Sequence, residues 1–282
     1  MKPSRGSRLL RVTILTFGFA FLYLPIVIMM VYSFNSSRLA TVWAGFSTKW
    51  YGELFNDQQI LDSLWVSLRI AFWTATAATV IGTLAAIAMT RFRRFPGKTL
   101  FGMLVTAPMV MPEVIIGLAI LLMLVSVGTV LGTPSKGMVP IWIAHVTLTV
   151  SFVTVVISAR LVDLDKSLEE AAMDLGANRL KVFIFITLPL IAPSLVSGWL
   201  LAFTLSLDDV VIASFLTGPD STTLPVKVFS FVRMGINPKI NALATLMVLA
   251  VVLGGAVAAW LMVRREQRQR KNRRTLLLES KR

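Results

Sequence analysis

Long runs of apolar residues, separated by polar or basic segments, restrict the fold of this chain more than any other feature. The first run covers residues 12–31, and about 20 residues of α-helix are enough to cross the hydrocarbon layer of a bilayer. Similar runs occupy residues 64–90, 99–130, 140–159, 188–216 and 242–263. With 56% hydrophobic residues, the chain is more apolar than a soluble domain. We therefore predict an all-α integral membrane protein with six transmembrane helices.

Positive charge is concentrated in the segments that lie on one side of these six spans. About three quarters of the 28 lysine and arginine residues fall in residues 1–11, 91–98, 160–181 and 264–282, and the positive-inside rule places such segments in the cytoplasm. We expect a basic cytoplasmic N-terminus, a membrane domain over residues 12–263 and a basic cytoplasmic tail that contacts anionic lipid headgroups. The net charge of +14 is therefore explained without nucleic acid.

Ionisable groups deep in a membrane segment often serve transport, and Glu113 is one such group. It follows Pro112 and lies about 22 Å along a helix from Lys98. Proline removes a backbone donor and clashes with the preceding turn, so Pro108 and Pro112 are expected to kink or break the third run. Glu113 then begins a new half-helix, where the helix dipole favours a carboxylate. Alternatively, Glu113 caps the broken backbone or pairs with Arg69.

Asp208 and Asp209 follow about 20 residues of apolar helix, yet residues 210–216 are apolar again. The pair therefore marks the external end of the fifth span, or a longer bent span carries it inside the membrane. Two adjacent carboxylates suit a multivalent cation, which offsets their repulsion. The alternative is an interfacial pair at a helix end. Glu113, Asp208 and Asp209 are our candidates for a substrate pathway.

Other chemistry-bearing residues give weaker signals. His145 has no histidine or carboxylate at metal-ligand spacing, so we expect it to make a helix–helix contact. Aromatic side chains could stack on an ammonium group, but in membrane helices they more often pack; they are Trp199, Phe203, Phe215 and Phe229. The sequence shows no nucleophile–base pairing and no phosphate-binding loop. We therefore predict no catalytic residue, no metal site and no cofactor.

The polar insertion at residues 170–189 separates the fourth and fifth runs and is predicted to contain a short amphipathic helix. Ser167 and Glu170 have the spacing of a capping box, and Gly176 can adopt the left-handed conformation that ends a helix. One face of this helix is apolar: Leu168, Ala171, Ala172 and Leu175. The opposite side carries Glu169 and Asp174. Such a helix either packs on its own protein or contacts another one, and the spacing favours neither.

The insertion resembles the EAA loop of bacterial ABC-importer permeases. The matching positions, with the same spacing, are Glu170, Ala171, Ala172, Gly176, Ile186, Leu188 and Pro189. Three other segments resemble the permease subunits of polyamine importers: FNSSRLATVWAGFSTKWYGELF (residues 34–55), FTLSLDDVVIASFLTGP (203–219) and TTLPVKVFS (222–230). Together these matches are spread over most of the chain, from residue 34 to residue 230.

The resemblance implies the six-helix permease fold of a type I ABC importer in the bacterial inner membrane. Its implied partners are a second homologous permease, a cytoplasmic ABC ATPase dimer and a periplasmic polyamine-binding protein, and its implied substrate is putrescine. ATP hydrolysis would then belong to another chain, and this chain would not be an enzyme. The loop at residues 160–189 would couple to the ATPase through Glu170, Ala171, Ala172, Gly176, Leu188 and Pro189. The acids Glu113, Asp208 and Asp209 would supply counter-charges for a dication.

Three alternatives remain at this point. The cargo could be spermidine or another solute delivered by a binding protein. A stand-alone channel or secondary transporter should show inverted repeats, and no such repeat is found in the sequence. A membrane-embedded enzyme would need a catalytic constellation, which the residues do not supply.

Overall fold

The computed structural model describes residues 5–38, 42–92, 94–234 and 238–279, and it is helical apart from one isolated bridge between Asn35 and Phe46. Within these ranges, six helices are long and apolar enough to cross a membrane. The all-α, six-span prediction is therefore confirmed. Arg93 and the extreme ends of the predicted basic termini, residues 1–4 and 280–282, lie outside the described residues. The chain divides into two compact units, residues 58–230 and the two terminal segments.

The unit formed by the terminal segments contains three helices: α1 (Arg5–Tyr32), α2 (Lys49–Phe55) and α12 (Pro238–Glu279). Helix α12 contacts both α1 and α2, and Lys239 at its start lies 3.5 Å from a Glu53 carboxylate oxygen and 3.4 Å from one of Asp57. Helix α12 continues unbroken past residue 263, so the predicted tail begins inside a helix. Its span is Pro238–Val257.

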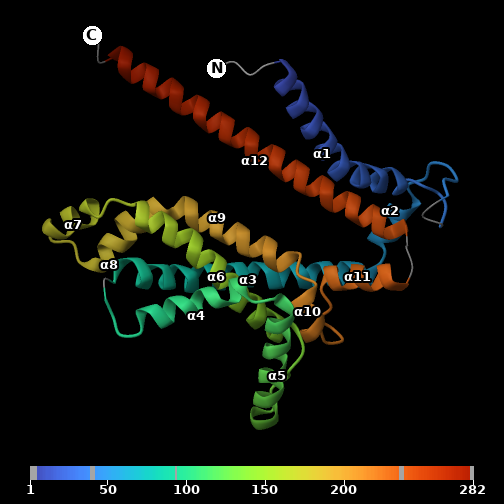
Figure 1. Cartoon of the computed structure of the whole chain (residues 1–282), viewed down its shortest axis with the longest axis horizontal. Coiled ribbons are helices and arrows are strands. Elements are labelled where there is room, and N and C mark those ends of the chain that lie inside the picture. Colours follow the sequence, from blue (N-terminus) through green and yellow to red (C-terminus); the bar gives the residue numbers. More distant parts are fainter. Residues whose placement is uncertain (1–4, 39–41, 93, 235–237, 280–282) are drawn as a thin grey trace. The chain divides into compact units, whose positions relative to one another are not determined.

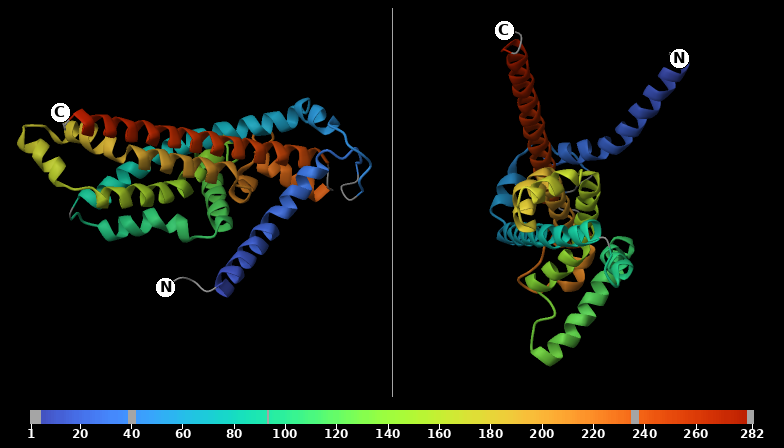
Figure 2. Two further views of the ribbon diagram at one scale, coloured as in Figure 1. Left: turned by 90° about the horizontal axis from the view of Figure 1, so that it is seen from above. Right: turned by 90° about the vertical axis from the view of Figure 1, so that its left-hand side faces the viewer.

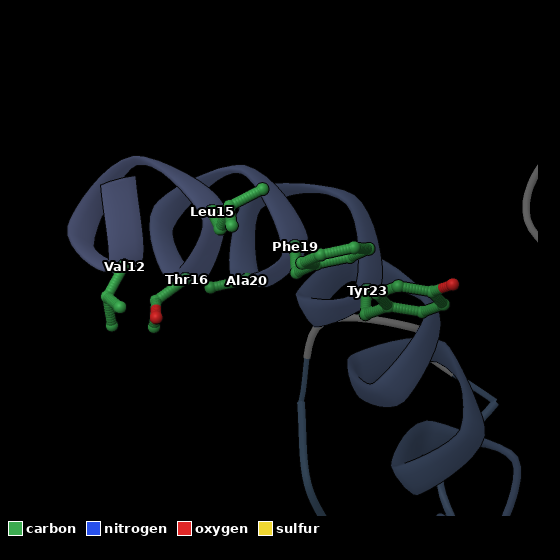
Figure 3. Close-up of a pocket in the computed structure, with 6 residues that line it drawn as sticks. All are labelled: Val12, Leu15, Thr16, Phe19, Ala20 and Tyr23. Atoms are coloured by element: carbon green, nitrogen blue, oxygen red, sulfur yellow. The ribbon is translucent and has the colours of Figure 1, made fainter. Parts of the chain in front are cut away.

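The membrane-length part of α1, Leu9–Tyr32, is strongly apolar, and none of the residues in its most apolar window is buried. A shallow cavity of about 530 Å³ runs along it (Figure 3), lined by Val12, Leu15, Thr16, Phe19, Ala20 and Tyr23. An apolar helix without cover is expected to face lipid or another membrane helix.

The segment between α1 and α2 is held by the Asn35 side chain and backbone. The Asn35 Nδ2 atom donates to the Val42 carbonyl at 2.7 Å, and the Asn35 Oδ1 atom accepts from the Ala44 amide at 2.9 Å. The indole Nε1 of Trp50 donates to the Asn35 carbonyl at 2.6 Å. Trp50 is 3% exposed, so this tryptophan fixes the fold of the loop.

The second unit is built on three packed helices, α3 (Gln58–Arg91), α6 (Met138–Asp163) and α9 (Leu188–Leu207). Small residues on α3, including the fully buried Ala75 and Ala78, let the neighbouring backbones approach closely. The remaining helices of this unit are α4 (Lys98–Val110), α5 (Glu113–Leu131), α7 (Ser167–Asp174), α8 (Arg179–Val182), the π-helix η1 (Phe183–Thr187), α10 (Val211–Leu216) and α11 (Leu224–Met234), whose last residues fall in the other unit.

The third apolar run is not one helix. It forms α4 and α5, which separate at Met111 and Pro112, and α5 leaves the layer of α3, α6 and α9 at a steep angle (Figure 1). The break follows from Pro112, whereas Pro108 is accommodated inside α4. Helix α4 has 13 residues and is too short to cross a membrane, so the third span is α5 with 19 residues.

The fifth run also departs from its predicted extent. Its helix begins earlier in the chain, at Arg179, and α9 ends at Leu207. Asp208 is the C-terminal cap of α9, and α10 is a separate helix of six residues. Residues 210–216 are apolar because α10 is buried: Ile212, Ala213 and Leu216 are completely inaccessible and pack with α3, α5 and α6.

Candidate functional site

The predicted coupling segment contains α7, which lies beyond the ends of the membrane helices and near the last turns of α3 and α6, and α8, with which the fifth span begins (Figures 1 and 2). Helix α7 begins at Ser167, but the predicted capping box is absent: the cap position is Lys166, and no side chain caps it. Instead, an Asp165 carboxylate oxygen accepts from the Ser167 amide at 2.9 Å. This backbone hydrogen bond lowers the pKa of Asp165.

The end of α7 agrees with the prediction. Gly176 has a φ of +89°, a conformation that costs little only for glycine. The Ala177 amide donates to the Ala172 carbonyl at 3.1 Å, and the Gly176 amide donates to the Met173 carbonyl at 2.9 Å. These two bonds form a Schellman motif, which satisfies carbonyls that the helix end would leave without donors.

Helix α7 leaves most of its apolar side uncovered by the protein. None of its residues is buried; Leu168 is 50% exposed, and Leu175, just after the helix, is 90% exposed. A helix that packed on its own chain would bury this side. The apolar surface is therefore free in the monomer, which favours contact with another protein over packing on its own chain.

The side of α7 that faces the protein carries an acid, Glu169. Its Oε1 atom accepts a hydrogen bond from Arg91 Nη2 at 2.9 Å and another from Thr187 Oγ1 at 2.8 Å. The side chains of Arg91 and Glu169 are only 16% and 18% exposed. Sequence spacing could not reveal this contact, because it joins the ends of α3 and η1 to a residue that the helical pattern placed on a solvated face.

The other predicted coupling residues occupy the same end of the unit. Glu170 and Ala171 are exposed on α7, and Ala172 is half-buried. Leu188 and Pro189 form the first turn of α9, directly after η1. Three of the six predicted residues therefore lie on α7, Gly176 lies just after α7, and two lie at the start of α9; their role in coupling remains a prediction.

The second candidate site surrounds the break between α9 and α10. Asp209 is buried there, and its Oδ2 atom accepts from the Ala213 amide at 2.7 Å while its Oδ1 atom accepts from the Ile212 amide at 3.3 Å. This is the arrangement of a residue that caps the start of a helix. Asp208, by contrast, is exposed. The adjacent acids therefore do not present two carboxylates on a common surface.

His145 on α6 completes the surroundings of Asp209. Its Nε2 atom lies 3.1 Å from Asp209 Oδ2, and its Nδ1 atom lies 2.7 Å from the Ser206 hydroxyl on α9. The expected helix–helix contact of His145 is confirmed. The carboxylate partner was not foreseen, because Asp209 is 64 residues further along the chain. In the part of the chain that the structure describes, no group of three or more potential ligands could hold a metal ion.

Glu113 is the first residue of α5, as the proline break predicted, and it is exposed. It lies close enough to His145, Asp208 and Asp209 for their charges to interact. This proximity follows from close packing of α5 on α10, where a β-carbon at Gly117 would meet Phe215 at 2.9 Å. The three predicted acids are thus near one another, but only Glu113 and Asp208 are exposed, whereas Asp209 is buried.

The predicted alternative partner of Glu113 is engaged elsewhere. Among the described residues, no ion pair joins Glu113 to Arg69, and the Arg69 guanidinium lies 5.9 Å from the Trp65 ring. Trp199 stacks on Phe203 with ring centroids 5.3 Å apart and donates to Thr76 Oγ1 at 3.2 Å. Packing, the more common use of such aromatics, is confirmed for this pair.

Residues 78–271 match the family described as "Binding-protein-dependent transport system inner membrane component". The match covers more than half of the chain, so the chain belongs to this family and is a multi-pass inner-membrane protein. It is 56% identical over 260 residues to the putrescine transport system permease protein PotI of Escherichia coli K12, covering 92% of both chains. It is 42% identical to the spermidine/putrescine transport system permease protein PotC of the same strain, covering 92% of this chain and 95% of the relative.

Two solved structures share the fold at 17% sequence identity. One is a chain of a bacterial ABC transporter involved in the import of the acidic polysaccharide alginate, with a TM-score of 0.72 over 92% of this chain and 98% of the other. The second is the bacterial alginate ABC transporter in complex with a pentasaccharide-bound periplasmic protein, with a TM-score of 0.70 over 87% of this chain and 90% of the other. The predicted fold of an ABC-importer permease is confirmed.

Proposed function

We propose that this chain is a permease subunit that carries putrescine from the periplasm to the cytoplasm in an ABC importer. The observation that carries this proposal is the 56% identity to a putrescine permease across 92% of both chains. The lower identity of 42% to a spermidine/putrescine permease makes spermidine the second candidate. The orientation that the basic segments predict, with both termini in the cytoplasm, would put α7 on the cytoplasmic side.

Helix α7 would dock on a cytoplasmic ATPase. Its apolar side is exposed through Leu168 and Leu175, and Glu170 and Ala171 are also exposed. Gly176 ends α7 in the conformation that turns the chain back to α8 and then to α9. ATP-driven closure of the ATPase dimer would move α7, and the membrane helices would respond by changing between inward-facing and outward-facing states.

Putrescine carries two positive charges, so its passage through a membrane requires negative groups along the path. Glu113 and Asp208 are exposed at one location, and we assign direct contact with the substrate to them. Asp209 would contribute by holding the start of α10 in place through the Ile212 and Ala213 amides. A second homologous permease would complete this path from the other side, and a periplasmic polyamine-binding protein would deliver the substrate.

Reconstitution tests the proposal directly. The chain would be placed in proteoliposomes with the co-encoded second permease, ATPase and binding protein. ATP hydrolysis and solute uptake would then be measured with binding protein loaded with putrescine, with spermidine or with a neutral solute.

Putrescine should give the largest stimulation of hydrolysis and the largest uptake. Greater stimulation by spermidine would make spermidine, rather than putrescine, the assigned substrate. Uptake that persists without the ATPase would favour a stand-alone channel or secondary transporter.

A further inference from the structure

Glu169 joins three elements at the end of the second unit. One carboxylate oxygen accepts from Arg91 Nη2 at 2.9 Å and from Thr187 Oγ1 at 2.8 Å. Arg91 is the last residue of α3, and Thr187 is the last residue of η1. A single side chain of α7 is therefore hydrogen bonded to the end of α3 and to the residue that precedes α9.

This contact is the main polar link between α7 and the helices of its own chain. Among the described residues, no other α7 side chain forms a hydrogen bond or ion pair with another helix, and α7 buries no residue. The Arg91 Nε atom is buried and has no hydrogen-bond partner, so Glu169 is the acceptor on which this guanidinium depends.

The geometry points to Glu169 as a positioning residue that, with Arg91 and Thr187, transmits the movement of α7 to α3 and α9. This inference rests on the proposed function, in which an ATPase moves α7. Glu169 is 18% exposed in its side chain and faces its own protein, unlike Leu175 on the accessible side. Its role is therefore to transmit movement within this chain rather than to bind the ATPase.

Helix α9 supplies the path from this contact to the acids. It begins directly after Thr187 and ends at Leu207, next to Asp208, and its 20 residues span about 30 Å. Rigid helices carry coupling between distant sites when both ends take part in defined contacts. The π-helix η1, which has a wider turn than an α-helix, lies at the start of this path, and such segments are frequent at functional sites.

The test uses the complete importer in proteoliposomes, with three readouts: the amount of ATPase bound, the rate of ATP hydrolysis and the putrescine transported per ATP hydrolysed. Glu169→Gln and Arg91→Gln should keep ATPase binding and lower putrescine transported per ATP at least about fivefold, the lower end of typical coupling between sites. Thr187→Val should act in the same direction with a smaller effect.

Matched controls remove the same charges from neighbouring exposed positions. Arg94→Gln and Asp163→Asn change residues that are exposed near the same end of the unit, and both variants should transport as the wild type does. The double variant with Arg91→Glu and Glu169→Arg should recover most of the coupling, because the Thr187 hydroxyl can accept from an arginine as readily as it donates to a carboxylate.

Wild-type transport per ATP in Glu169→Gln would overturn the inference. Loss of ATPase binding in Glu169→Gln would also overturn it, because Glu169 would then belong to the docking surface. If Glu169→Gln does not reach the membrane, unchanged coupling in Thr187→Val would be the contrary result. A wild-type importer without ATP-dependent uptake would overturn the proposed function itself, before any variant is compared.

Discussion

The Nε2 atom of His145 lies 3.1 Å from Oδ2 of Asp209, and the two side chains are 1% and 4% exposed. The same carboxylate accepts from the amides of Ile212 and Ala213 at the start of α10. Asp208, the preceding residue, is exposed. Two adjacent acids in one short break between helices thus have opposite environments, and their substitutions should have different consequences.

Asp209→Ala should destabilise the protein. It leaves His145 Nε2 and two backbone amides without their acceptor, and each buried unsatisfied polar group costs about 1–3 kcal/mol. The measurement is the midpoint of thermal unfolding of the purified protein in detergent. Asp208→Ala is the matched control and should change stability by no more than about 0.5 kcal/mol. Equal midpoints for the two variants would contradict the structural role of Asp209.

Glu113→Gln and Asp208→Asn should each weaken transport of a dication. A solvent-exposed charge pair contributes up to about 1 kcal/mol, so each variant should raise the half-saturating putrescine concentration of the complete importer by up to about fivefold. Uptake of labelled putrescine at a series of concentrations measures this effect. Asp62→Asn removes an exposed carboxylate near the start of α3 and serves as control. Unchanged uptake in both variants would leave Glu113 and Asp208 with structural roles.

Much of this architecture could be predicted from the chain because it follows from local chemistry. Apolar runs of membrane length predicted the number of spans. Pro112 was expected to interrupt the third run because a proline has no amide hydrogen to donate. Gly176 ended α7 as expected, because few other residues tolerate its φ of +89°. Each of these features depends on residues that are close together in the sequence.

The contacts that were missed depend on residues far apart in the sequence. Asp209 contacts His145, which lies 64 positions away in the sequence, and Glu169 contacts Arg91, which lies 78 positions away. The helical pattern of α7 placed Glu169 and Asp174 on a solvated side; Asp174 is exposed, but Glu169 faces the protein. In a soluble monomer the apolar face would turn inward; here it stays exposed, as expected when a partner chain covers it.

Gly117→Ala should push α5 away from α10. A β-carbon at this position would lie 2.9 Å from Phe215 and 3.3 Å from the Ile212 α-carbon, and such overpacking typically costs about 1–3 kcal/mol. Thermal unfolding in detergent measures the loss. Gly102→Ala is the control, because its nearest neighbour is the flexible end of Met89 at 3.5 Å. Adding Phe215→Leu should restore part of the stability. If the stability does not recover, the strain arises from a contact other than the one with Phe215.

Leu175→Glu should prevent the ATPase from binding and leave the fold intact. Leu175 is 90% exposed, so its replacement disturbs no packing, whereas a charge in a docked apolar contact is costly. Co-purification of the ATPase should fall at least about tenfold, equivalent to about 1.4 kcal/mol. Glu170→Lys should have a similar effect. Phe92→Glu, an equally charged change at an exposed residue outside α7, should bind normally; loss of binding there would extend the docking surface beyond α7.

Asp165→Ala should loosen the first turn of α7, because the Ser167 amide loses its acceptor. The hydrogen bond lowers the pKa of Asp165 below its ordinary value of 3.8, so the stabilisation is fully present above that value. It is lost as the pH falls through the lower pKa of the folded state. Between about pH 5 and pH 8 the wild-type contact should therefore not change with pH.

Hydrogen exchange followed by mass spectrometry on peptides that cover α7 measures the effect, after correction for intrinsic exchange rates. Asp165→Ala should exchange faster than the wild type over this whole pH interval. Asp163→Ala removes an exposed carboxylate of equal charge that does not hold the Ser167 amide, and it should exchange as the wild type does. Equal protection in the two variants would mean that α7 begins stably without Asp165, and the start of α7 would then depend on its contacts with the rest of the unit.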